Sequence, residues 1–278
     1  MATAPRDAIT ALFVPGDRPD RFAKALGAGA DVVIVDLEDA VAAAEKPEAR
    51  LNVRRALEAG DTGIMVRINP PGTVWHDEDL DLVADFGVED GLLGVVVAKA
   101  ESAEGLSAVH ARMKSGVEII ALIESARGLA AVREIAGAGG VSRLAFGAID
   151  LALDLDSTSE KMLDLARFEL AVASRVAELA PPLDTPSVEI RDVDAVGESA
   201  RHARGFGFGG KLCIHPAQLA PVRAAFVPTT EEVSWAELVL TAGTESATQV
   251  GGIMVDRPVI ERARRILATA AAAHGAAA

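Results

Sequence analysis

The sequence alternates short apolar runs with helical patterns along most of its length, and this alternation limits the folds that are open to it. The runs are rich in β-branched residues, which is typical of parallel strands buried on both faces. Eight βα units predict a closed (β/α)8 TIM barrel, and a doubly wound open sheet is the alternative because the seventh run is weak. The runs lie at residues 11–14, 32–37, 63–68, 93–98, 117–123, 144–149, 183–188 and 210–214.

The last part of the chain lies outside this alternation. We expect a catalytic barrel over residues 8–228 and a C-terminal helical extension over residues 229–278. The extension contains a hairpin-like stretch at 250–256 and apolar helical stretches at 235–240 and 259–267 that must pack against something. Because the barrel does not need these residues for closure, we predict that the extension is a lid that contacts a neighbouring subunit.

The composition indicates the compartment and excludes some partners. A chain of 278 residues buries roughly three quarters of its unfolded surface, so the fold needs no disulfide and no structural zinc. The single cysteine, Cys213, cannot form an intrachain disulfide and suits a reducing compartment. No signal-peptide pattern is present at residues 1–7 and no apolar run reaches membrane-spanning length, so we expect a cytoplasmic protein without a membrane partner. The formal charge of −14 argues against nucleic acid as a partner.

Two carboxylates, Glu124 and Asp150, follow the fifth and sixth apolar runs. If these runs are neighbouring parallel strands, both acids lie at the edge where α/β folds place their chemistry. Two hard oxygen ligands with room for water suit Mg²⁺. The alternative is that each acid caps the helix after its strand, but the matching positions of the pair favour a metal site.

Further polar residues are expected at the same edge of the barrel. Arg67 follows the third run, and a planar guanidinium suits bidentate binding of a substrate carboxylate, although a salt bridge to a nearby acid is the alternative. Glu38 and Asp39 follow the second run and could accept hydrogen bonds from metal-bound water, or be solvated loop acids or a helix start. Lys99 and His215 are expected to be structural, in an ion pair and in hydrogen bonding respectively.

Several segments resemble those of the citrate lyase beta subunit family. They read LFVPGDRPDRF (12–22), DLEDAV (36–41), VRIN (66–69), IESARG (123–128), CIHP (213–216) and MVDRP (254–258). The wider group, the HpcH/HpaI aldolase and malyl-CoA lyase superfamily, includes malyl-CoA lyases and related acyl-CoA lyases. The resemblance implies a (β/α)8 barrel, a homotrimer or a hexamer of trimers, and Mg²⁺-dependent cleavage or formation of a carbon–carbon bond in a 3-hydroxyacyl-CoA. Its small-molecule partners would be a 2-oxo acid and an acyl-CoA.

The resemblance also assigns roles to individual residues. It implies that Glu124 and Asp150 bind the metal and that Arg67 binds the carboxylate of the 2-oxo acid. The same carboxylate would be contacted by backbone amides of Gly147, Ala148 and Ile149. Arg21 and Lys24 lie where relatives hold CoA phosphates, and Asp256 matches an acid that some stand-alone relatives supply from a neighbouring subunit. Asp256 could instead start the helix at Pro258, where a carboxylate favours the helix dipole.

One position departs from the family pattern. Relatives often carry an acid immediately before the Asp of the sixth strand, but this chain has Ile149 there, which leaves the surroundings of the metal one acid poorer. The favoured function is a stand-alone lyase for malyl-CoA, citramalyl-CoA or citryl-CoA. The alternatives are the beta subunit of a multi-subunit citrate lyase that acts on a citryl-acyl carrier protein, a malate synthase or thioesterase side activity, and a barrel that has lost turnover.

Overall fold

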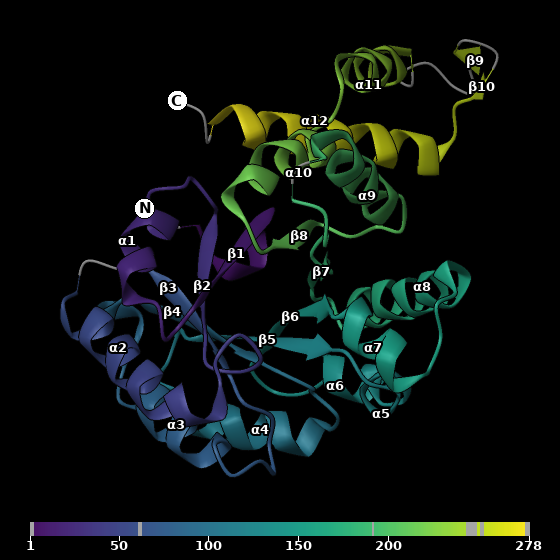
Figure 1. The fold of residues 1–278 in the computed structure, drawn as a ribbon. Helices are drawn as coiled ribbons and strands as arrows, with labels where there is room; N and C mark the ends of the chain where they lie inside the picture. The colour runs from purple at the N-terminus through teal and green to yellow at the C-terminus, as the bar shows by residue number, and fades with distance from the viewer. Residues whose placement is uncertain (1–2, 61–62, 191, 243–248, 251–252, 276–278) are drawn as a thin grey trace. The chain divides into compact units, whose positions relative to one another are not determined.

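The computed structural model describes residues 3–60, 63–190, 192–242, 249–250 and 253–275 (Figure 1). The chain forms two compact units, which consist of residues 1–223 and 224–278. The first unit contains a closed barrel of eight parallel strands in sequential order, and β8 pairs with β1 to close it. The predicted (β/α)8 barrel is confirmed, and the open sheet is excluded. The strands are β1 (Thr10–Pro15), β2 (Val32–Asp36), β3 (Ile64–Ile68), β4 (Leu92–Val97), β5 (Glu118–Ile123), β6 (Val141–Phe146), β7 (Ala180–Asp184) and β8 (Gly210–Cys213).

Helices follow the strands and cover the outside of the barrel (Figure 1). The α-helices of this unit are α1 (Phe22–Leu26), α2 (Lys46–Glu58), α3 (His76–Ala84), α4 (Ala103–Arg112), α5 (Ala126–Ala130), α6 (Val132–Ala136), α7 (Ala148–Asp154), α8 (Glu160–Val176) and α9 (Val193–Gly205). Short 3-10 helices are η1 (Pro5–Asp7), η2 (Pro19–Arg21), η3 (Ala43–Glu45), η4 (Val88–Asp90) and η5 (Pro216–Gln218). The helix α10 (Leu219–Phe226) spans the division between the two units.

The barrel interior is filled by small and branched side chains rather than by a channel. A Cβ at Gly94 would lie 2.6 Å from the Glu118 carbonyl oxygen and 2.8 Å from Met65 Cε. Glycine is therefore required at this position, because any side chain would separate β4 from β5 or displace Met65. The buried core cluster comprises Ala8, Ala11, Val32, Ile34, Met65, Val96, Ile120, Leu122, Ala145, Leu183 and Leu212.

Two strands differ from the sequence prediction. The sixth was expected to continue to residue 149, but β6 ends at Phe146 and Gly147 turns the chain into α7. Asp150 therefore lies in the first turn of a helix rather than directly after a strand. The seventh was expected at 183–188, whereas β7 spans Ala180–Asp184 and contains two prolines, which cannot donate to the ladder and obscure the strand pattern.

The second unit consists of helices and a two-stranded antiparallel sheet. Its elements are α11 (Thr230–Ala242), β9 (Gln249–Val250), β10 (Ile253–Met254) and α12 (Arg257–Gly275). Ala236 and Val239 of α11 pack with Ala263 and Ile266 of α12, and Arg262 lies over the Trp235 ring at 5.2 Å. The apolar stretches of the extension thus pack against each other. No helix in the described part of the chain is long and apolar enough to cross a membrane.

Candidate functional site

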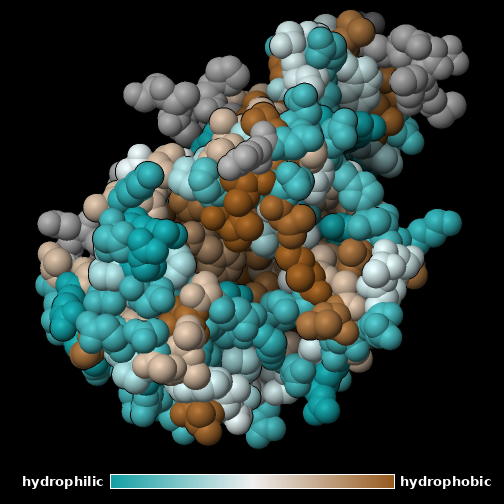
Figure 2. Space-filling view, viewed as in Figure 1, coloured by the Kyte–Doolittle hydropathy of each residue, from teal (hydrophilic) through white to brown (hydrophobic). Residues whose placement is uncertain are grey.

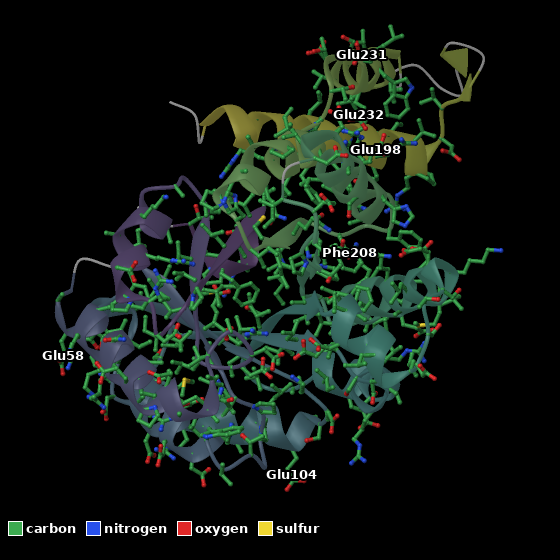
Figure 3. The ribbon with its side chains drawn as sticks, in the orientation of Figure 1. Glu58, Glu104, Glu198, Phe208, Glu231 and Glu232 are labelled. Atoms are coloured by element: carbon green, nitrogen blue, oxygen red, sulfur yellow. The ribbon has the colours of Figure 1, made fainter. Side chains whose placement is uncertain are left out.

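Glu124 is a buried carboxylate at the carboxyl end of β5. Its side chain is 2% exposed, whereas Glu58 on α2 and Glu104 on α4 point outward into solvent (Figure 3). Oε1 of Glu124 accepts the Lys99 N–H at 2.8 Å, and no described residue donates a hydrogen bond to Oε2. Burial raises the pKa of Glu124 to about 8; the charges of Glu38 and Asp150 also raise it, and those of Arg67 and Lys99 lower it. Glu124 Oε2 is therefore an oxygen that a ligand could still contact.

Gly147 allows Asp150 to approach Glu124. A Cβ at position 147 would lie 2.5 Å from Glu124 Oε2, so any larger residue would displace the carboxylate. The Gly147 N–H donates to the Ile123 carbonyl at 2.9 Å, which holds the end of β6 against β5 before α7 begins. The Asp150 side chain makes no hydrogen bond or ion pair with any described residue, and its charge acts on Glu124. The two acids predicted as a pair are therefore brought together.

The oxygen donors of this pair fit Mg²⁺. The cation usually takes one or two protein carboxylates and completes its octahedral sphere with water and substrate oxygens. Glu124 offers Oε2, and Asp150 offers its whole carboxylate. Among the described residues, no group of three or more His, Cys, Asp or Glu side chains could hold a metal, which argues against a cage made only of protein ligands. Glu124 and Asp150 are thus the residues that could hold the cation.

Arg67 is fixed by acids from the neighbouring strand. Its Nε and Nη2 donate to Asp36 at 2.7 and 2.6 Å, Nη1 lies 3.1 Å from Glu38 Oε2, and the guanidinium lies 4.8 Å from the Phe13 ring centre. Burial lowers the pKa of Arg67, but the hydrogen bonds and charge of Asp36 outweigh it and raise the pKa above its usual value. The salt bridge considered as an alternative for Arg67 is present. It leaves one N–H each on Nη1 and Nη2 that can still face a ligand.

Two residues to which the sequence analysis assigned no role, Lys46 and Asn69, hold the loop after β2. The Lys46 ammonium, which is buried, donates to the Leu37 and Glu38 carbonyls at 2.7 and 2.8 Å and to Asn69 Oδ1 at 3.0 Å. Burial lowers the pKa of Lys46. Asn69 in turn donates to the Leu37 carbonyl at 2.8 Å. No pattern in the sequence distinguishes Lys46 from a solvated lysine at the start of a helix.

The Lys99 ammonium lies between acids that follow two different strands, β2 and β5. Its Nζ lies 2.5 Å from Glu38 Oε1, 3.4 Å from Asp39 Oδ2 and 3.9 Å from Glu124 Oε1. Burial raises the pKa of Glu38, and the hydrogen bond from Lys99 acts in the opposite direction. The Lys99 residue adopts φ +45°, which is unusual for a side chain other than glycine. The expected ion pair of Lys99 is present, but it lies among the candidate metal ligands.

Thr185 is a site residue that the sequence did not indicate. It follows β7, and its Oγ1 accepts the Ala148 N–H at 3.2 Å. The preceding residue, Asp184, is buried and accepts hydrogen bonds from Arg167 and Lys211 at 3.0 and 2.7 Å. Because the seventh strand was predicted too late in the chain, Thr185 was placed inside a strand rather than at the edge of the barrel.

The backbone amides predicted to contact a ligand differ in their availability. Those of Gly147 and Ala148 donate to Ile123 and Thr185. The Ile149 amide lies in the first turn of α7, where N–H groups have no partner within the helix, and the Ile149 side chain is 54% exposed. Figure 2 shows other apolar side chains gathered where Figure 1 places β7 and β8.

The remaining predicted residues make no hydrogen bond or ion pair with these acids among the described residues. Arg21 and Lys24 are exposed on η2 and α1 and form no ion pair with a described residue. Asp256 belongs to the second unit and its Oδ1 accepts the Val259 N–H at 3.2 Å, as the alternative of a helix cap predicted. His215 Nδ1 accepts the Ala217 N–H at 3.1 Å, which confirms its structural role. Burial raises the pKa of the Cys213 thiol to about 12, so this cysteine is an inert core residue.

Comparisons with known proteins agree with this arrangement. The model of the HpcH/HpaI aldolase/citrate lyase family matches residues 10–216. A citrate lyase subunit beta-like protein of Mycobacterium tuberculosis is 39% identical over 267 residues, which cover 92% of this chain and 93% of the relative. A (3S)-malyl-CoA thioesterase of Cereibacter sphaeroides is 31% identical, over 94% of each chain.

A solved structure shows the same likeness. The crystal structure of protein CitE from Mycobacterium tuberculosis, in complex with magnesium, acetoacetate and coenzyme A, superimposes with a TM-score of 0.83. It is 36% identical to this chain, and the match covers 96% of this chain and 99% of that one. The resemblance drawn from the sequence motifs is confirmed, and the chain belongs to the HpcH/HpaI aldolase/citrate lyase family.

Proposed function

We propose that this protein is a Mg²⁺-dependent carbon–carbon lyase that cleaves or forms a 3-hydroxyacyl-CoA of the malyl, citramalyl or citryl type. The observation that carries the proposal is the pair Glu124 and Asp150 at the carboxyl end of the barrel: Glu124 Oε2 has no donor among the described residues, and the charges of Asp150 and Arg67 both act on Glu124. The CitE structure that binds magnesium, acetoacetate and coenzyme A supports the same set of ligands for this chain.

Glu124 and Asp150 would hold the cation, which when bound supplies Lewis-acid stabilisation of the oxygen that becomes negative in the reaction. Glu38 and Asp39 would accept hydrogen bonds from water around the cation. Glu38 is well placed for this because Lys46 fixes its carbonyl and Arg67 lies 3.1 Å from its carboxylate. The chain thus fixes the acids before the substrate arrives, which reduces the reorganisation needed during reaction.

Arg67 would orient the 2-oxo acid through the N–H groups that Asp36 and Glu38 leave available. A guanidinium held by two hydrogen bonds to Asp36 cannot rotate away, so the substrate carboxylate meets a fixed donor. Orientation of this kind can lower a barrier by several kcal/mol. The Ile149 amide would be a further donor to this carboxylate, with Gly147 and Ala148 shaping the turn that presents it.

The CoA moiety would be held by the exposed cations after β1. Arg21 and Lys24 carry no ion pair with a described residue, and in a chain of charge −14 such cations are suited to phosphate groups. The acyl-CoA leaves as its enolate in the cleavage direction, and a base must take the proton of the substrate hydroxyl. We assign this base to Asp256 of a neighbouring subunit in a homotrimer or a hexamer of trimers, with residues 229–278 as the lid.

A mixing experiment tests the shared site. Asp256→Ala and Glu124→Ala should each be inactive as homo-oligomers, whereas oligomers refolded from both chains should regain a fraction of the activity. Native mass spectrometry would verify that the mixed oligomers have formed. An active Asp256→Ala homo-oligomer would leave this residue as the cap of α12 only.

Thioester hydrolysis is the second candidate function. The similarity to a (3S)-malyl-CoA thioesterase favours it. Both reactions use the same acids and the same CoA ester but release different products. A subunit of a multi-subunit citrate lyase would instead require the substrate on an acyl carrier protein.

Product analysis separates these functions. The purified protein would be incubated with Mg²⁺ and malyl-CoA, citramalyl-CoA or citryl-CoA, and the products identified by mass spectrometry. A lyase releases an acyl-CoA and a 2-oxo acid, and a thioesterase releases free CoA and the hydroxy acid. Chelation of the metal should stop either reaction. Turnover that persists without a divalent cation, or the absence of turnover with every ester, would contradict the proposal.

A further inference from the structure

The backbone of Lys99 is held in a conformation that costs free energy. Its φ of +45° lies in the left-handed region, which residues other than glycine rarely adopt unless the surrounding structure holds them there. Here the conformation aims the Lys99 N–H at Glu124 Oε1, 2.8 Å away. Lys99, the second residue after β4, thereby fixes Oε1 of the candidate metal ligand Glu124 and leaves Oε2 available.

The side-chain ammonium of Lys99 also lies near Glu124. Its ammonium is 2.5 Å from Glu38 Oε1 and 3.9 Å from Glu124 Oε1. Glu38 and Glu124 come from different strands, and both are almost completely buried. Two buried carboxylates repel each other unless a cation stands between them, and Lys99 supplies that charge in the absence of a metal.

A metal on Glu124 would conflict with this ammonium. Two cations that share the oxygens of one buried carboxylate repel each other, and at about 4 Å this repulsion is large wherever water is scarce. The Lys99 side chain is 35% exposed, so it is not locked in place as Arg67 is. It also lines a cavity of about 380 Å³, so there is space for the displaced ammonium. Glu101 lies on the same wall, but it already accepts a hydrogen bond from Ser125 at 2.8 Å and lies 3.6 Å from Arg127.

We propose that Lys99 is a displaceable counter-ion: its ammonium neutralises Glu38 and Glu124 in the metal-free protein and moves out of the way when Mg²⁺ binds. The proposal rests on the metal site of the proposed function. In this role Lys99 is a positioning residue that also weakens the affinity for the metal. It holds the two buried acids in position before the cation arrives, and it lowers the affinity for Mg²⁺ because it must first be displaced.

The test is calorimetric titration of the full chain with Mg²⁺ alone. Lys99→Met removes the ammonium, and so does Lys99→Gly, which in addition suits a positive φ and so keeps the backbone hydrogen bond to Glu124. Both variants should bind Mg²⁺ about tenfold more tightly than the wild type. Lys99→Arg keeps the charge and should stay within about twofold of the wild type. If Lys99 had only a structural role, Lys99→Met and Lys99→Gly would bind Mg²⁺ more weakly than the wild type.

Thermal melting provides a second readout. In buffer that contains a chelator, Lys99→Met and Lys99→Gly should have lower melting temperatures than the wild type because Glu38 and Glu124 lose their counter-ion. Saturating Mg²⁺ should remove this difference in melting temperature. Unchanged or weaker Mg²⁺ binding by both variants, with a wild type that binds, would overturn the counter-ion role and leave the metal site intact. A wild type that does not bind Mg²⁺ would overturn the metal site itself and the inference with it.

Discussion

Two arginines at opposite ends of the barrel, Arg67 and Arg143, show how a candidate site residue differs from a purely structural one. Arg67, at the carboxyl end of β3, is bound by the carboxylates of Asp36 and Glu38. Arg143, near the start of β6, donates only to the carbonyls of Pro5, Ala8 and Pro181 and has no acid within ion-pair distance among the described residues. Burial lowers the pKa of Arg143, whereas the pKa of Arg67 is raised.

The difference lies in the partners rather than in burial. Nε and Nη1 of Arg143 donate to carbonyls of the N-terminal segment and of β7, so this arginine links these segments at the amino end of the barrel. Arg67 is surrounded by the acids Asp36, Glu38 and Glu124, and Glu124 Oε2 has no donor among the described residues. An excess of acids with an available ligand atom therefore marks the functional end, and hydrogen bonds to backbone carbonyls mark the structural end.

The largest effect is expected at the functional end. Glu124→Gln should lower turnover by at least about 10³-fold, because a metal supplies several kcal/mol of stabilisation to developing charge. The exposed Glu58→Gln on α2 is the matched control and should leave turnover unchanged. Steady-state kinetics with Mg²⁺ measures both. Wild-type turnover in Glu124→Gln would show that the carboxyl end of the barrel is not the functional end, and the contrast with the end that holds Arg143 would be lost.

At the other end, a change should affect stability and not chemistry. Arg143→Met should lower the free energy of unfolding by roughly 3 kcal/mol, because three carbonyls, two of them buried, lose their donor. Arg133→Met on α6, which breaks an exposed ion pair with Glu169, should cost less than about 1 kcal/mol. Urea unfolding gives both values. Loss of turnover per folded molecule in Arg143→Met would show that this arginine also contributes to the reaction and is not purely structural.

Arg67→Lys sharpens the role of the first arginine. Lysine keeps the charge but loses the fork that Asp36 holds, so binding of pyruvate should weaken by roughly 30-fold while CoA binding changes little. Calorimetric titration with each ligand separately gives the two constants. Equal losses for both ligands would mean that the substitution disturbs the whole site.

The smallest effect is expected at Thr185. Thr185→Val keeps the shape but removes the acceptor of the Ala148 N–H, which should lower turnover about tenfold by loosening the turn before Asp150. Thr185→Ser retains the hydroxyl and should behave as the wild type. Kinetics together with Mg²⁺ titration of both variants tests this. Identical behaviour of the valine and serine variants would exclude a positioning role.

The sequence predicted the barrel and its acids better than the contacts among them. Apolar patterning located most strands because parallel strands buried on both faces read as continuous runs. It did not show that Arg67 and Asp36 face each other across β2 and β3, since this pairing depends on strand register. It also extended the sixth strand past Gly147, where a close approach to Glu124 forces a turn, and the prolines of β7 concealed Thr185.

The central claim, a cation held by Glu124 and Asp150, is tested most directly by anomalous diffraction from crystals grown with Mn²⁺ in place of Mg²⁺. The account predicts one strong peak between the two carboxylates, at about 2.0–2.3 Å from an oxygen of each, with the Lys99 ammonium displaced. A peak held by other residues, or no peak at saturating Mn²⁺, would contradict it.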